Sequence, residues 1–152
     1  MNDYKEKPFP DYCVRGVPNS SYIGDSDGIR FAYPHSIYEN ERSHSSINWV
    51  DEEKAIIDLL KETKVDDRGI EKIKYESGYI KIPERILRDL KRSSRLGGFN
   101  DFDYERDPIE EDKDRGIKEN KYHGNLIFKS TNDKRCKILA HAILAFAVFI
   151  SR

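Results

Sequence analysis

The chain has 152 residues, of which 37% are hydrophobic, 36% charged and 11% aromatic, and its formal net charge is −1. A domain of this length buries roughly 68–70% of the surface that its unfolded chain exposes, and the aromatic content argues against a disordered chain. The near-zero net charge excludes the global basic field that draws a protein to nucleic acid or to anionic lipid. Any such binding must therefore be local.

The two cysteines, Cys13 and Cys136, are far apart in the sequence and form no C-x-x-C motif. This pattern predicts a reduced, cytoplasmic protein without a metal site or a cofactor. The first seven residues are polar and lack the apolar stretch of a signal peptide, which favours the same location.

The first 48 residues are rich in Gly, Pro, Ser and Asn, yet they also carry seven aromatic side chains. We expect a long irregular region that packs onto a core. Short strands are predicted near residues 12–15 and 29–33, with a turn at residues 24–28 between them.

A helix is predicted from residue 49 to about residue 64. Asn48 can cap it, and the acidic residues 51–53 place negative charge at its positive end. Residues 70–82 then predict a short hairpin, with Gly78 in the turn.

Pro83 fits the first turn of a second helix, which Gly97 and Gly98 would end after about residue 95. The following stretch, residues 100–120, is acidic, lacks periodicity and contains a proline and a glycine. We expect a long loop there.

Residues 122–129 alternate enough to predict a strand, and an apolar helix follows at residues 134–150. Strands and helices mix without regular βαβ alternation, so the predicted class is α+β: a small antiparallel sheet packed with about three helices. We expect a single domain over residues 1–152, with residues 49–152 as its α+β core.

The second helix carries an arginine stripe on the side opposite its apolar residues. The stripe consists of Arg85, Arg88, Arg92 and Arg95. One interpretation is a solvated helix face. The other is contact with phosphate or nucleic acid, because guanidinium groups form bidentate hydrogen bonds to phosphate. Whether the acidic loop 100–120 folds back onto this stripe is left open by the sequence.

His123 stands beside Gly124 at the start of the predicted strand 122–129. A histidine at the mouth of a strand is a candidate general acid or base. With Arg15 or the arginine stripe holding phosphate, it would suit a ribonuclease-like or nucleotide-directed reaction. The alternative is a histidine that satisfies a turn.

The segment Val14-Arg15-Gly16, the serine-rich residues 43–46 and Glu105 follow the Arg, Ser, Glu order of ADP-ribosyltransferases. The chain loosely resembles that family at these few positions. In the family the arginine and the glutamate frame a nicotinamide dinucleotide, so the resemblance implies that Arg15 and Glu105 would lie around one ligand.

The apolar run of residues 138–150 would form a helix about 20 Å long, which is too short for a hydrocarbon layer of about 30 Å. We therefore expect no membrane span. Because a helix that is apolar all round must be covered all round, one side is predicted to meet a partner or a second copy of the chain. That side contains Leu144 and Val148, with His141 at its edge, where it is expected to be buried.

Two functions remain open. The first is a small intracellular interaction or regulatory protein that acts by protein–protein contact. Its composition suggests a bacterial or phage origin, and a defence, counter-defence or toxin–antitoxin setting suits a chain of this size. The second is a small metal-independent enzyme, ribonuclease-like or ADP-ribosyltransferase-like, with His123 as acid or base.

Overall fold

The computed structural model describes residues 2–18, 22–24, 30–32, 37 and 44–152. A six-stranded sheet, antiparallel at every pairing, forms its centre, with the strand order β10-β7-β1-β4-β9-β8. The strands are β1 Tyr12–Val17, β4 His44–Trp49, β7 Gly78–Pro83, β8 Phe102–Arg106, β9 His123–Phe128 and β10 Val148–Ser151. The predicted α+β class is confirmed.

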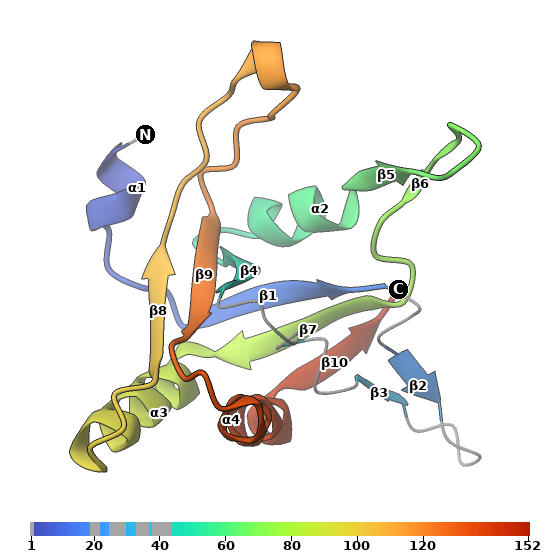
Figure 1. Ribbon diagram of the computed structural model, residues 1–152. Helices are drawn as coiled ribbons and strands as arrows, with labels where there is room; N and C mark the ends of the chain where they lie inside the picture. The colour runs from blue at the N-terminus through green and yellow to red at the C-terminus, as the bar shows by residue number, and fades with distance from the viewer. Residues whose placement is uncertain (1, 19–21, 25–29, 33–36, 38–43) are drawn as a thin grey trace.

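Helices lie on both sides of this sheet (Figure 1). α3 and α4 contact β7, and α2 contacts β1 and β4 from the other side. The helices are α1 Asn2–Glu6, α2 Lys54–Leu60, α3 Glu84–Leu96 and α4 Asp133–Phe146. Two further antiparallel pairs are β2 Tyr22–Gly24 with β3 Arg30–Ala32, and β5 Thr63–Val65 with β6 Glu71–Ile73.

The main hydrophobic core fills the space between the sheet and the helices α3 and α4. Cys13 is paired with Ile82 on one side and with Trp49 on the other, so all three side chains point to the same face. Leu87 of α3 and Ile143 of α4 pack against this face, and all five residues are at most 1% exposed. Alternation along the strands therefore decides which residues enter the core.

Several predicted elements are confirmed with small shifts. The strand predicted at residues 12–15 continues to Val17, the helix after Pro83 ends at Leu96, and the strand predicted at residues 122–129 is β9. The strand expected at residues 29–33 corresponds to β3, whereas most of the turn expected at residues 24–28 lies outside the described residues.

The predicted cap at Asn48 is wrong, because Asn48 lies inside strand β4. Its side chain donates to the carbonyl oxygen of Ala55 and accepts a hydrogen bond from Asn120. α2 begins only at Lys54 and has no side-chain cap at Glu53. Ile47 and Trp49 alternate with polar residues, and this strand period outweighs the capping propensity of the asparagine.

The hairpin predicted at residues 70–82 is wrong, because its turn is not at Gly78. The turn lies at residues 66–70 between β5 and β6, where the Asp66 carboxylate accepts from the backbone N–H groups of Arg68 and Ile70. Gly78 instead begins β7 at φ +123°, and a side chain there would overlap the carbonyl oxygen of Ile150. Close approach of two strands, rather than a tight turn, requires this glycine.

The acidic stretch 100–120 is not one long loop, because it contains β8. The side chains of Phe102, Tyr104 and Arg106 are buried, and the acidic residues between them are half-buried. Beyond β8 the chain continues into an arm, defined here as residues 107–122, which projects from the sheet with a 3₁₀ helix at Lys113–Arg115. The strand was not predicted, because the acidic side chains obscured its alternation of buried and half-buried residues.

The C-terminal helix predicted at residues 134–150 ends early. α4 stops at Phe146, and Val148 belongs to β10, which pairs with β7. Val148 is therefore not on one helical side with Leu144, which packs against the core, and His141 is exposed rather than buried. None of the helices in the described ranges is long and apolar enough to cross a bilayer.

Candidate binding surface

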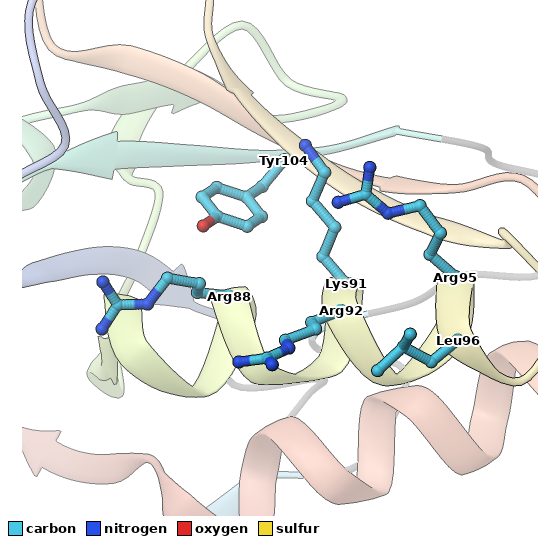
Figure 2. A pocket seen from close by; sticks show the side chains of 6 residues that line it. All are labelled: Arg88, Lys91, Arg92, Arg95, Leu96 and Tyr104. Carbon is cyan, nitrogen blue, oxygen red and sulfur yellow. The ribbon is translucent and has the colours of Figure 1, made fainter.

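A cavity of about 450 Å³ lies between α3 and β8 (Figure 2). We call it the cationic groove. Its lining consists of Arg88, Lys91, Arg92, Arg95, Leu96 and Tyr104. Figure 2 shows Lys91 and Arg95 extending from the helix toward the strand, with Tyr104 reaching from β8 toward α3.

Three contacts fix α3 alongside β8. The hydroxyl of Tyr104 donates to Glu84 Oε1 over 2.9 Å near the start of the helix. Lys91 Nζ lies 2.8 Å from Asp103 Oδ1 in its middle, and Ser94 hydrogen-bonds to Asp101 near its end. From the first of these contacts to the third, the residue numbers rise along α3 and fall along β8. The groove therefore runs between two elements of opposite chain direction.

Burial and the hydrogen bond to Glu84 raise the pKa of Tyr104 above its ordinary value. Tyr104 therefore keeps its proton at neutral pH and contributes no negative charge to the groove. Among the described residues, four cationic side chains and no carboxylate line the groove.

The arginine stripe is largely unneutralised. Within the part of the chain that the structure describes, no carboxylate lies within 4.0 Å of Arg85, Arg92 or Arg95, and Arg88 reaches only Glu84 at 4.0 Å. Asp103 pairs with Lys91, so the acidic segment touches the groove but leaves the stripe arginines uncovered. Arg85 belongs to the stripe but does not line the groove.

A second cavity of about 510 Å³ adjoins the start of α4. We call it the apolar-rimmed pocket, because Phe99 and Ile138 line it and remain 64% and 57% exposed. The Arg135 guanidinium lies 4.7 Å from the centre of the Phe99 ring and pairs with Asp101 at 2.7 Å. Lys129 and Lys134 also line this pocket.

A third cavity, of about 780 Å³, lies on the other face of the sheet. We call it the His123 cleft; α2, the β5–β6 pair and the arm form its walls. His123 Nδ1 lies 2.8 Å from the carbonyl oxygen of Asp107. Because a carbonyl only accepts, Nδ1 carries the proton in this contact and Nε2 is the ring nitrogen left for a ligand.

Opposite charges nearly balance in the His123 cleft. Its ionisable lining residues, apart from His123 and Tyr75, are Lys61, Lys74, Lys118, Asp58, Glu62, Glu71 and Glu119. Tyr75 also lines it, and burial together with nearby Glu62 raises the pKa of its phenol. The balance gives this cleft no preference for a polyanion.

The structure separates the other residues predicted for chemistry. Arg15 is not itself a lining residue of the His123 cleft, although its guanidinium donates over 2.7 Å to the carbonyl oxygen of Ser46, which does line it. Glu105 lies on β8, and β4 and β9 stand between it and Arg15. At strand spacings of about 4.8 Å the two residues are roughly 14 Å apart, so the pair implied by the ADP-ribosyltransferase resemblance is not assembled.

The groove residues Lys91 and Tyr104 and the rim residue Phe99 were not predicted from the sequence. Lys91 could have been found, since it stands three residues after Arg88 and four before Arg95 on the same helix. Tyr104 and Phe99 enter through strand β8 and the loop before it, which acidic residues had masked.

Comparison with known proteins adds no family to this description. No protein-family model matches the chain, and no curated protein or solved structure is similar to it. The fold and its surfaces therefore define the molecule as an α+β protein with a cationic groove beside an exposed apolar rim.

Proposed function

We propose that this is an interaction protein that binds an acidic segment of a partner protein in the cationic groove. The observation that carries the proposal is that Arg92 and Arg95 line the groove without a carboxylate partner among the described residues. Arg92 and Arg95 are exposed, so their guanidinium groups are open to a ligand, and a guanidinium group can hold a planar carboxylate by two hydrogen bonds.

Two features favour a protein over a nucleic acid. The formal net charge of the chain is −1, so long-range attraction to a polyanion is absent. Leu96 in the groove is 78% exposed, and a protein partner can cover this apolar side chain with apolar side chains of its own, which a phosphate backbone lacks. Cys13 and Cys136 are both buried and form no disulfide with each other, which supports a cytoplasmic location.

The proposal is tested with a fluorescein-labelled glutamate-rich peptide and fluorescence anisotropy. We expect the peptide to bind, and the double variant R92E/R95E to bind at least about ten-fold more weakly, because each like-charge contact opposes the carboxylates. The single variants Arg92→Glu and Arg85→Glu form the matched pair: each changes the charge of the same helix by the same amount, but only Arg92 lines the groove.

Equal weakening by Arg85→Glu would mean that only the general charge of α3 matters, and the groove would lose its role. No measurable binding of the peptide would also overturn the proposal. Tighter binding of single-stranded or duplex oligonucleotides than of the peptide would assign the groove to nucleic acid instead.

A second candidate function is a small metal-independent enzyme acting on RNA or a nucleotide at the His123 cleft. His123 lines this cavity, and its Nδ1 contact with Asp107 leaves Nε2 as the ring nitrogen without a role in that contact, which favours this candidate. Turnover of an RNA oligonucleotide or a nucleotide by the wild type, lost in His123→Gln, would support this candidate. Equal turnover by both proteins, or none by either, would remove it.

A further inference from the structure

The cationic groove and the apolar-rimmed pocket are joined by the loop at residues 97–101. Asp101 hydrogen-bonds to Ser94 of α3 and pairs with Arg135 of α4, so one buried carboxylate holds both helices. Phe99 packs against Gly97 at the end of α3. Figure 2 shows Leu96 on the side of α3 where α4 passes.

We infer that the occupant of this surface is an amphipathic acidic segment. Its carboxylates pair with Arg92 and Arg95 in the groove, and a bulky apolar residue anchors it in the apolar-rimmed pocket against Phe99 and Ile138. This inference rests on the proposed function and names the chemistry of the partner.

The exposure of the rim argues for an apolar anchor. Phe99, Ile138 and Leu96 keep 57–78% of their surface in solvent although they lie beside cavities. Covering such side chains removes apolar surface from water, and the gain scales with the area covered. Large exposed apolar residues gathered beside one charged groove mark a contact surface rather than scattered surface residues.

The charged residues around the pocket favour a partner segment that carries negative charge. Lys129 and Lys134 line it; Lys129 lies 3.7 Å from Asp103, and Arg135 is held by Asp101 while its guanidinium covers the Phe99 ring. Phe99 is thereby fixed by a cation–π contact from one side. An anchor flanked by carboxylates complements these lysines, whereas an anchor flanked by basic residues is repelled.

The test uses two labelled peptides with the same glutamates, one with a leucine or phenylalanine anchor and one with serine in its place. We expect the anchored peptide to bind the wild type about ten-fold more tightly, as the burial of one large apolar side chain predicts. Phe99→Ser should abolish this advantage, so that the two peptides bind this variant with equal affinity.

Phe146→Ser is the matched control, because Phe146 is 59% exposed on α4 and lines neither cavity. Equal affinity of the two peptides for the wild type, or an equal effect of Phe99→Ser and Phe146→Ser, would overturn the apolar anchor. In both cases the serine peptide still binds, so the proposed function survives. If neither peptide binds, the proposed function itself fails. Binding of the rim to phosphatidylserine vesicles in preference to the anchored peptide would overturn a protein partner.

Discussion

Arg106 shows how one residue can tie the N-terminal segment to the sheet. Its side chain is 2% exposed and forms two hydrogen bonds with the Asp51 carboxylate, at 2.6 and 2.8 Å. The same guanidinium donates to the carbonyl oxygens of Lys7 and Pro8. The buried guanidinium thus donates four hydrogen bonds, two of them to a carboxylate, and these offset the cost of burying an ion.

Replacing Arg106 with methionine should lower the free energy of unfolding by about 3–5 kcal/mol, because Asp51 and two carbonyl groups lose their donor inside the protein. Urea denaturation followed by the fluorescence of Trp49, the single tryptophan, measures this loss. The control is Arg115→Met, whose exposed pair with Asp112 should cost less than about 1 kcal/mol. Similar costs for both variants would contradict the buried pair.

Arg106 also marks what the sequence could not indicate. In the sequence it stands among acidic residues and looks like an ordinary charged surface residue. Nothing nearby indicates its burial, because its partner, Asp51, lies 55 positions away. The arginine stripe, by contrast, was predictable, because i, i+3 and i+4 spacing on a helix needs no distant partner.

At the scale of elements, the junction of α3, α4 and β8 depends on Asp101. Burial by itself raises the pKa of this carboxyl, but hydrogen bonds from Arg135 and Ser94 and the charge of Arg135 outweigh burial. The pKa is lowered below its ordinary value of 3.8. A lowered pKa means that the ionised form stabilises the fold and that protonation weakens it.

We therefore expect stability from Asp101 to be complete above about pH 4, the unfolded-state value, and to decline as the pH falls toward the lower folded-state pKa. Asp101→Asn should be less stable than the wild type at pH 7, and the difference should shrink on acidification. Thermal unfolding between pH 7 and pH 3 measures both. A difference that stays constant with pH would show that Asp101 is not ionised in the folded protein.

The pairing of β10 with β7 depends on Gly78. An alanine there adds a Cβ against the Ile150 carbonyl oxygen and is strained at φ +123°. Gly78→Ala should detach β10, so the Arg152 amide, which donates to Ser77, should exchange hydrogen faster. Gly69→Ala, also at positive φ but with open space around it, should leave this amide protected. Equal exchange in both variants would contradict the close approach.

Helices and strands were predictable where the local sequence pattern favoured only one kind of element. Helix α3 has a proline at its start, glycines at its end and an apolar stripe, and its bounds were predicted within about one residue. β10 and β4 were missed because apolar runs and asparagine fit more than one element, and the choice depends on the neighbouring strand. The candidate groove was half predicted: its arginines come from α3, but its other wall comes from the missed β8.

For the whole molecule, self-association through the C-terminal residues stays a prediction, and the fold changes the residues that test it. Leu144 packs against the core, so a charge there should unfold the protein rather than break an assembly. Val148 is 57% exposed on β10. Val148→Lys should keep the fold and, if copies associate there, lower the mass measured by light scattering. A monomeric wild type, or an unchanged mass, would exclude this interface.

The strand order β10-β7-β1-β4-β9-β8 has a consequence for biosynthesis. The two central strands, β1 and β4, come from the first 49 residues, but Cys13 pairs with Ile82 and Asn48 with His123. A ribosome adding about 5–20 residues per second therefore leaves the apolar faces of β1 and β4 without their partners for several seconds. During that interval the nascent chain carries the strands most prone to aggregate, and chaperones are expected to matter more for its yield than the stability of the finished fold.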